Sequence, residues 1–208
     1  MRFRRRLICS LLAASICCTP ALSGCSSKEE SSFAQNEAGA KDQADSADTD
    51  GAKEDSVNLG EFSLEDINGE VYTQEMFAEY DLTMVNVFAT WCSPCVKEIP
   101  DLEKLHQEMG ERGVNIAGIV LDTVDGSGKK DEEGVEKAKL LAEKTGASYP
   151  FLIPDEGNLN GIISGVSAVP TTFFVDKEGN IVGEIYTGAR SFQDWKSIAE
   201  GVMNEVGK

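Results

Sequence analysis

The sequence predicts a single α/β domain, with a central mixed β-sheet flanked by helices, behind an export signal and a polar linker. Three observations support this prediction: two nearly continuous apolar runs of strand length, amphipathic helical segments between and after them, and two closing strands joined by a polar turn. The chain has 208 residues, which suffices for one hydrophobic core with extensions.

The first 24 residues have the composition of a secretory signal peptide. Four arginines lie among residues 2–6, and a mostly apolar stretch follows at 7–18, shorter than the roughly 20 apolar residues of a membrane-spanning helix. The next residues, Leu22-Ser23-Gly24-Cys25, resemble the lipobox of bacterial lipoproteins. We therefore expect removal of residues 1–24 and a lipid anchor on Cys25. Cleavage at other small residues nearby, or an uncleaved anchor, are the alternatives.

Residues 25–58 are predicted to be the lipid-anchored cysteine followed by a disordered acidic linker. From residue 26 to 58 there are three lysines and nine acidic residues, and Phe33 and Val57 are the large apolar side chains. This composition buries too little apolar surface to offset the entropy of ordering, so we predict a flexible tether spanning on the order of 30 Å. A calcium site is the alternative, but the usual Asp-x-Asp-x-Asp-Gly spacing is missing.

The composition indicates a globular, acidic domain at residues 59–208. Hydrophobic residues make up 41% of the chain and charged residues 26%, with a formal net charge of −17. Removal of the predicted signal would leave 15 basic and 36 acidic residues, a net charge of −21. Because such a surface repels phosphates, we expect no nucleic-acid partner.

The domain is expected to begin with a β-hairpin and a short helix. Apolar residues around 62–64 and at 71–72 flank Asn68-Gly69, a dipeptide typical of tight hairpin turns. Residues 74–80 are expected to form the short helix that follows.

Two buried strands are predicted on either side of a cysteine-bearing helix. Residues 82–89 and 114–121 are apolar runs of strand length, as expected where both faces of a sheet are covered. Between them, a helix is expected after Trp91-Cys-Ser-Pro-Cys95 and as far as Arg112, because apolar residues recur there at helical spacing. This strand–helix–strand order predicts a parallel pair.

The remaining segments are predicted to complete the sheet and to cover it. A charged helix at 132–144, a short strand at 149–153 and a weak helix at 159–163 follow a polar loop. Two strands joined by a polar turn, and then an amphipathic helix, are expected at 171–176, 181–186 and 192–206. The two strands should form an antiparallel edge on an otherwise parallel sheet.

Cys92 and Cys95 are the candidate redox pair. Four of the six cysteines lie within the first 25 residues, so these two alone belong to the domain. At a helix start, unpaired backbone N–H groups and the helix dipole stabilise a thiolate, which makes Cys92 the predicted nucleophile. Cys95, one turn later, can attack a mixed disulfide and release the partner, which makes it the predicted resolving thiol.

Other roles of a Cys-x-x-Cys pair fit these residues less well. A zinc site requires about four ligands, whereas the domain adds only His106 as a histidine and no further cysteine, so we expect no metal site. Haem attachment requires a histidine directly after the second cysteine, where Val96 stands. A purely structural disulfide is a further alternative, although one that closes so small a loop stabilises little.

Three motifs together resemble thioredoxin-fold proteins of the TlpA/ResA type. They are Trp91-Cys-Ser-Pro-Cys95 after an apolar strand, Glu98-Ile-Pro100 in the following helix, and Val169-Pro170-Thr-Thr-Phe173 before a strand. The resemblance spans roughly residues 59–206. It implies a thioredoxin-like fold with an N-terminal hairpin and an inserted helix–strand element near 132–153, and the activity of a membrane-attached, extracytoplasmic thiol-disulfide oxidoreductase.

The resemblance also assigns roles to single residues. Pro170 matches the family's cis-proline, which faces the disulfide and leaves the backbone of Val169 free to pair with an extended substrate. Trp91 matches an aromatic residue beside the site, where packing and partner contact both fit. Glu98 matches an acid that adjusts the thiol pKa and assists proton transfer, with a solvated carboxylate as the alternative. Asn86 agrees with this branch, whereas cytoplasmic thioredoxin has a buried aspartate there.

The resemblance predicts a reductase of disulfides in exported bacterial proteins. The cysteine pair would cycle between dithiol and disulfide with no organic cofactor or metal, and a membrane thiol donor would supply the electrons. We expect a monomer outside the cytoplasm, held at the cell membrane through Cys25. Only the resemblance favours reduction over oxidation, because tens of millivolts decide the direction.

Three alternatives differ in what the pair does. The protein is a disulfide-forming oxidase if its potential is high, or a redox sensor or binding module if the pair does not turn over. A peroxidase relative shares the fold, but its site requires threonine or serine three residues before the cysteine, where Ala89 stands. Nothing in these residues selects a particular substrate protein.

Overall fold

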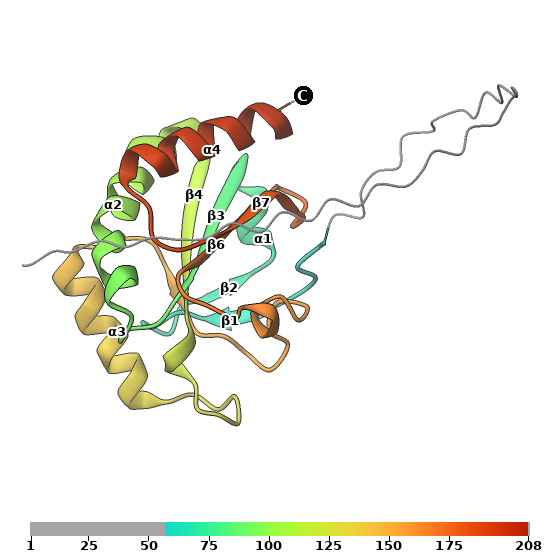
Figure 1. The fold of residues 1–208 in the computed structure, drawn as a ribbon. Coiled ribbons are helices and arrows are strands. Elements are labelled where there is room, and N and C mark those ends of the chain that lie inside the picture. The colour runs from blue at the N-terminus through green and yellow to red at the C-terminus, as the bar shows by residue number, and fades with distance from the viewer. Residues whose placement is uncertain (1–56, 208) are drawn as a thin grey trace, which may run out of the picture. The chain divides into compact units, whose positions relative to one another are not determined.

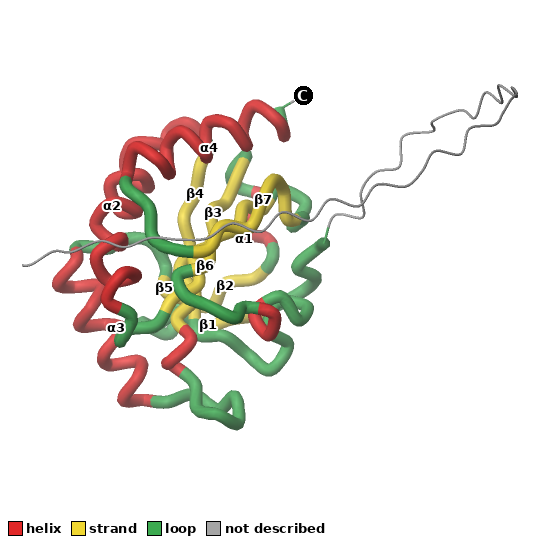
Figure 2. The backbone as a smooth tube through the Cα atoms, in the orientation of Figure 1, coloured by secondary structure: helices red, strands yellow, loops and turns green. Residues whose placement is uncertain are grey.

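The computed structural model describes residues 57–207, whose fold is drawn in Figure 1 and Figure 2. The predicted signal peptide, the lipid-modified Cys25 and the linker up to residue 56 lie outside the described residues. At the start of the described chain, the Val57 carbonyl accepts a 2.8 Å hydrogen bond from Ile181 N, and Asn58 forms a β-bridge with Asn180. The sheet edge therefore includes two residues that we had assigned to the linker.

A five-stranded mixed sheet forms the centre of the domain, in the order β5-β4-β3-β6-β7. β3, β4 and β5 are parallel to one another, and β6 and β7 are antiparallel to their neighbours. Every residue of β3, β4 and β6 is buried, which accounts for their continuous apolar runs. The strands are β3 (Leu82–Phe88), β4 (Val114–Val120), β5 (Phe151–Leu152), β6 (Thr171–Val175) and β7 (Ile181–Thr187). The predicted mixed sheet with an antiparallel edge is confirmed.

Three helices pack on one face of this sheet, as Figure 1 shows. They are α2 (Ser93–Met109), α3 (Glu132–Thr145) and α4 (Phe192–Val206). Strand residues alternate between the two faces, so Met84 and Phe88 of β3 pack with the helices, whereas Val85 and Val87 join a second apolar cluster on the opposite face. Both sides of the central strand are therefore covered, which fixes its register.

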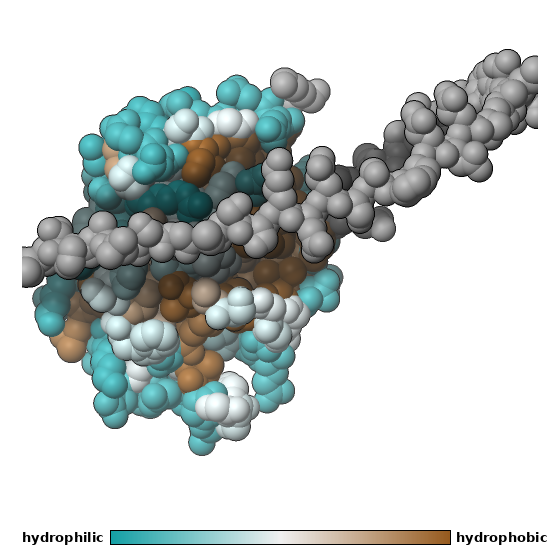
Figure 3. Space-filling view, in the orientation of Figure 1, coloured by the Kyte–Doolittle hydropathy of each residue, from teal (hydrophilic) through white to brown (hydrophobic). Residues whose placement is uncertain are grey.

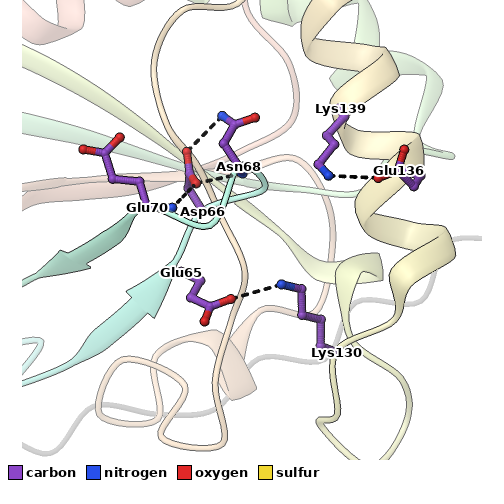
Figure 4. Close-up of polar contacts among 7 residues, drawn as sticks. All are labelled: Glu65, Asp66, Asn68, Glu70, Lys130, Glu136 and Lys139. Carbon is purple, nitrogen blue, oxygen red and sulfur yellow. Dashed lines mark hydrogen bonds and ion pairs between the residues drawn. The ribbon is translucent and has the colours of Figure 1, made fainter.

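The opposite face is covered by the N-terminal hairpin, a short helix and a loop. The hairpin consists of β1 (Ser63–Glu65) and β2 (Val71–Thr73), and α1 (Glu75–Ala78) follows it. Asp66 stabilises the hairpin turn because its Oδ1 accepts from the backbone N–H groups of Asn68 (2.8 Å) and Glu70 (2.9 Å), as Figure 4 shows. Glu65 pairs with Lys130 Nζ at 3.0 Å, which links the hairpin to the loop before α3. The predicted hairpin is confirmed.

One predicted helix, at residues 159–163, is wrong. Asn158, Leu159 and Asn160 all have positive φ, which is incompatible with a right-handed helix. Leu159 is nevertheless buried in the second apolar cluster, and a single 3-10 turn, η3, follows at Ile163–Gly165. The apolar spacing that we interpreted as helical therefore reflects a loop that buries Leu159 and Ile163.

Several other elements differ from the prediction at their ends, whereas α4 has the predicted bounds. α2 passes into a 3-10 turn, η1 (Gly110–Arg112), and Gly113 ends it at a φ of +86°. α1 and β5 are shorter than expected, because α1 covers four residues and β5 two.

Figure 3 shows the surface of the domain in the orientation of Figure 1. Hydrophilic residues lie over the outer helices and loops, and hydrophobic residues gather between them.

Candidate active site

The cysteine pair lies where the central strand gives way to α2. Cys92 is the N-cap residue of this helix, with extended backbone angles (φ −80°, ψ 102°), and its Sγ accepts from Cys95 N at 3.3 Å. The two cysteines form a disulfide with a Cα–Cα distance of 5.3 Å, and Cys92 is 5% exposed. In the reduced state the same backbone N–H and the helix dipole would stabilise a Cys92 thiolate.

The segment before β6 lies against the same sulfur. Cys92 Sγ is 3.7 Å from the carbonyl oxygen of Val169, and the Val169–Pro170 peptide bond is cis. Antiparallel pairing of β3 with β6 brings residues so distant in sequence together, because Val87 pairs with Thr171 one residue after Pro170. Val169 is partly buried and Pro170 is buried. The structure thus brings Val169 and Pro170, two of the three predicted substrate-binding residues, to the cysteine pair.

Glu98 is a buried acid rather than a solvated one. It lies one turn after Cys95 on α2, and the residue is 3% exposed. Its Oε1 accepts two hydrogen bonds of 2.7 Å, from the backbone N–H of Arg190 and from the indole Nε1–H of Trp195. Burial raises the pKa of the Glu98 carboxyl, although these donors act in the opposite direction.

Asn86 connects Glu98 to the sheet. Asn86 and Thr172 are paired across β3 and β6 and lie on the helix-covered face, so Asn86 Nδ2 donates to Thr172 Oγ1 at 2.9 Å. The same Nδ2 is 3.5 Å from Glu98 Oε2. The buried amide therefore faces the second oxygen of the carboxyl group.

Trp195 and Arg190 were not predicted to belong to the site. Trp195 occupies the first turn of α4, which begins with a capping box between Ser191 and Asp194. This Ser-x-x-Asp pattern was the available signal, since it places the start of α4 and so the tryptophan next to the loop after β7. That the indole reaches Glu98, 97 residues earlier, depends on the packing of α4 on α2.

Trp91 lies beside the disulfide with most of its ring in solvent. It is 73% exposed, and with Val96, Leu140 and Leu141 it lines a surface pocket of about 490 Å³. Leu140 of α3 is itself 51% exposed. An exposed aromatic residue next to a redox-active sulfur forms an apolar surface that a partner chain can contact.

The backbone before Trp91 is held by an acid on the neighbouring turn. Asp122 accepts from the backbone N–H of Thr90 at 2.9 Å and from its hydroxyl at 2.5 Å. Asp122 belongs to the 3-10 turn η2 (Leu121–Thr123) that follows β4. The parallel pairing of β3 with β4 therefore positions the backbone at Thr90, directly before Trp91 and the cysteine pair.

His106 packs against an aromatic residue further along α2. Its ring contacts Tyr149 edge-on, with ring centroids 6.0 Å apart, at a position two turns beyond Glu98. Within residues 57–207, no three side chains of the metal-binding types gather into one cluster. In the same part of the chain, no helix is both long and apolar enough to cross a membrane.

The family of the chain follows from comparison with known proteins. The model of the AhpC/TSA family matches residues 58–183, which include the hairpin, the cysteine pair and the cis-proline. The chain belongs to this family. The AhpC/TSA match ends within β7, so α4 and with it Trp195 lie beyond the matched residues.

Several proteins similar to this chain are named as thiol-disulfide oxidoreductases or interchange proteins. The thiol-disulfide oxidoreductase ResA of Halalkalibacterium halodurans is 33% identical over 157 residues, which cover 74% of this chain and 79% of the relative. The thiol:disulfide interchange protein DsbE of Haemophilus influenzae is 30% identical over 135 residues, 65% of this chain and 66% of the relative. A thioredoxin-family thiol:disulfide interchange protein from Chlorobium tepidum superposes with a TM-score of 0.60 at 25% identity, covering 73% of this chain and 99% of that structure.

These comparisons confirm the predicted resemblance and the thioredoxin-like fold. The protein is a thiol-disulfide oxidoreductase of the ResA/DsbE type. The roles of the individual residues and the direction of electron flow stay predictions.

Proposed function

We propose that the protein is an extracytoplasmic, membrane-tethered reductase that uses Cys92 and Cys95 to reduce disulfides in exported proteins. The observation that carries this proposal is the position of Cys92 at the start of α2, bonded to Cys95 and in contact with Val169. A sulfur at a helix N-terminus is activated as a thiolate, and its neighbour is within reach to complete the exchange.

The proposed reaction moves two electrons and two protons from the enzyme to the substrate. The Cys92 thiolate attacks one sulfur of a substrate disulfide, and the other substrate sulfur leaves as a thiolate and takes up a proton. Cys95, after losing its proton, then attacks Cys92 Sγ in the mixed disulfide, which breaks the bond between Cys92 and the substrate and releases the second substrate sulfur as a thiolate that takes up a proton. The products are a reduced substrate and the Cys92–Cys95 disulfide, which a membrane thiol donor must reduce again. The cysteine pair is itself the redox group, so this reaction needs no organic cofactor or metal.

Glu98 is proposed as the group that accepts the proton of Cys95 before the second attack. It lies one turn from Cys95 on α2, and the residue is 3% exposed. Burial raises the pKa of Glu98 toward the pH at which a general base works best. The raised pKa and the short helical separation support this role.

Trp91, Val169 and Pro170 are proposed to bind the substrate. Trp91 directly precedes Cys92 and is exposed, and the carbonyl oxygen of Val169 is 3.7 Å from Cys92 Sγ. An extended substrate segment would pair with the Val169 backbone while its cystine approaches Cys92. Such recognition is independent of substrate sequence, since backbone groups supply the hydrogen bonds.

The tether is proposed from residues outside the described structure. The Leu22-Ser23-Gly24-Cys25 sequence supports lipid attachment at Cys25, and the acidic segment up to residue 56 would hold the domain away from the membrane. Export and lipid attachment can be tested by labelling cells with a radioactive fatty acid. Label should enter the wild-type protein and be absent from Cys25→Ala, and label in both would contradict the proposed anchor.

The decisive experiment traps the reaction intermediate. Cys95→Ser, expressed in the native host, should accumulate mixed disulfides between Cys92 and its substrates, which diagonal gels separate and mass spectrometry identifies. Cys92→Ser is the matched control and should trap none. No adduct under either oxidising or reducing growth would support the redox-sensor alternative, and adducts limited to a quinone-linked or oxidising partner would support the oxidase alternative.

A further inference from the structure

The two oxygens of the Glu98 carboxyl group are held in unequal ways. Oε1 accepts two short hydrogen bonds, from Arg190 N and Trp195 Nε1, both 2.7 Å long. Oε2 has one long contact, to Asn86 Nδ2 at 3.5 Å. A carboxyl oxygen has two lone pairs, so both acceptor positions of Oε1 are filled by groups that donate and cannot accept.

We propose that Trp195 is a positioning residue, which together with the Arg190 backbone fixes the Glu98 carboxyl group so that its exchangeable proton is carried on Oε2. This inference rests on the proposed role of Glu98 in proton transfer with Cys95. A proton on Oε1 would require the loss of one of two strong hydrogen bonds, whereas Oε2 has room for it. Proton exchange then takes place at the oxygen next to Asn86.

Asn86 suits both states of that oxygen. Its side-chain NH2 faces Oε2 and can donate to it when it is ionised. If the amide group turns over, its carbonyl oxygen faces Oε2 instead and can accept from the protonated oxygen. Thr172 Oγ1 offers the amide a hydroxyl partner, which is itself both a donor and an acceptor. An amide cannot itself take up the proton, so the proton stays with Glu98.

The indole group has no freedom to leave its position. Trp195 is 0% exposed and packs edge-to-face on Tyr186, with ring centroids 5.8 Å apart. The guanidinium group of Arg190 lies over both rings, at 5.0 and 5.1 Å, and its Nη1 donates to the carbonyl of Gly188 at 2.9 Å. The capping box at Ser191 sets the start of α4 and so the height of Trp195 along the helix. The indole N–H of Trp195 is therefore held in place by its own packing, independently of its hydrogen bond to Glu98.

Other ionisable groups lie around Glu98. They come from α2 itself, from the loop after β7, from α4 and from the segment before β5, and they are Cys95, Lys97, Asp101, Arg190, Asp194 and Tyr149. Among them, the charge of Arg190 lowers the pKa of Glu98. Trp195→Phe removes the indole N–H and substitutes none of these residues. Because the Arg190 guanidinium lies over the rings of both Trp195 and Tyr186, a substitution at Tyr186 is the matched control.

The test is Trp195→Phe in the full-length chain, with Tyr186→Phe as the matched control. Phenylalanine keeps an aromatic ring in the stack but has no N–H, and the control removes a hydroxyl from the neighbouring ring, which makes no hydrogen bond to Glu98. We expect the titration midpoint of Glu98, followed by ¹³C NMR of its side-chain carboxyl carbon, to rise by about one pH unit in Trp195→Phe, since a hydrogen bond to a charged group accounts for roughly a tenfold change. An unchanged midpoint, or an equal rise in Tyr186→Phe, would overturn the assignment.

A second measurement follows the indole group of Trp195 itself. The chain has two tryptophans, so Trp91→Phe assigns the indole ¹⁵N–¹H signal of Trp195 directly. We expect this signal to shift with the midpoint of Glu98, to stay protected from hydrogen exchange below that midpoint, and to lose its titration in Glu98→Gln. A signal that becomes rapidly exchanging when Glu98 is protonated would place the proton on Oε1 and refute the proposal.

Failure of this inference can be distinguished from failure of the proposed function. The inference concerns the titration of Glu98, which is measured in the oxidised protein without any turnover. The proposed function is measured separately, as the pH profile of insulin disulfide reduction by the same proteins. If the proton-transfer role holds, the acidic limb of this profile in Trp195→Phe moves with the Glu98 midpoint. A shifted Glu98 midpoint with an unshifted activity profile supports the positioning role and contradicts the role of Glu98 in catalysis.

Discussion

Gly134 is the position at which a single added methyl group should most clearly disturb the backbone that precedes the cysteine pair. It lies in the first turn of α3, and a Cβ atom added there would be 1.8 Å from the carbonyl oxygen of Asp122 and 3.1 Å from Thr123 Cα. The obstacle is backbone, which cannot rotate away as a side chain can. Asp122 also holds Thr90 directly before Trp91, so the disturbance reaches the active site.

The magnitude for Gly134→Ala follows from this geometry. Non-bonded carbon–oxygen contacts are about 3.3 Å, so α3 and the η2 turn must separate by roughly 1.5 Å. Overpacking of this kind costs about 3 kcal/mol at the upper end of its usual range, and the better helix propensity of alanine offsets about 1 kcal/mol. We therefore expect a net loss of about 2 kcal/mol in the free energy of unfolding, or roughly 4–8 °C in Tm for a domain of this size.

Gly201→Ala is the matched control, because Gly201 is also a helical glycine. It lies on the exposed side of α4, and an added Cβ would meet nothing within 4 Å. Alanine should stabilise the protein there by about 0.4–1 kcal/mol. Urea unfolding of the oxidised protein, followed by circular dichroism, measures both variants. A Gly134→Ala protein as stable as the wild type, alongside a stabilised Gly201→Ala, would refute the steric argument.

Three further predictions concern charge and capping. Burial raises the pKa of Glu98 above its ordinary value of 4.5, so the folded protein loses stability as pH rises from that value through the folded-state pKa. Glu98→Gln should remove this loss. A difference in unfolding free energy between Glu98→Gln and the wild type that stays constant from about pH 3 to 8 in urea unfolding would contradict the prediction. Ser191→Ala removes the capping box of α4 and should cost about 1 kcal/mol in the same assay, with an unchanged midpoint as the contrary result. Lys177→Ala breaks an exposed ion pair with Asp81 and should change stability by less than about 0.5 kcal/mol, so a larger loss would show that the pair is not simply a surface contact.

The chemistry of the cysteine pair could be predicted because it depends on local structure. A Cys-x-x-Cys pair directly after a buried strand places its first sulfur at a helix N-terminus, and the structure has Cys92 as the N-cap of α2. The same holds for the hairpin, whose Asn68-Gly69 turn is local, and for α4, which has the predicted bounds of 192–206.

Whether Glu98 is buried or solvated could not be predicted from the sequence. Its spacing from Cys95 placed it one turn along the helix, yet a buried acid and a solvated one both fitted that position. The two donors to its Oε1 come from residues 92 and 97 positions further along the chain, and no local pattern encodes their approach. The failed helix at 159–163 has a similar cause, because burial of Leu159 in a loop produces the same apolar spacing as one helical turn.

Features that depend on neighbours along the chain could be read from the residues: the order of the sheet strands and of the three long helices, the thiol at a helix start and the acidic surface. Which distant groups meet depends instead on tertiary packing. Pairing of β3 with β6 brings Val169 to Cys92 and Thr172 to Asn86, and packing of α4 on α2 brings Trp195 to Glu98. These contacts depend on how whole elements pack around one core, and the energy of that packing is shared over many residues rather than carried by a motif.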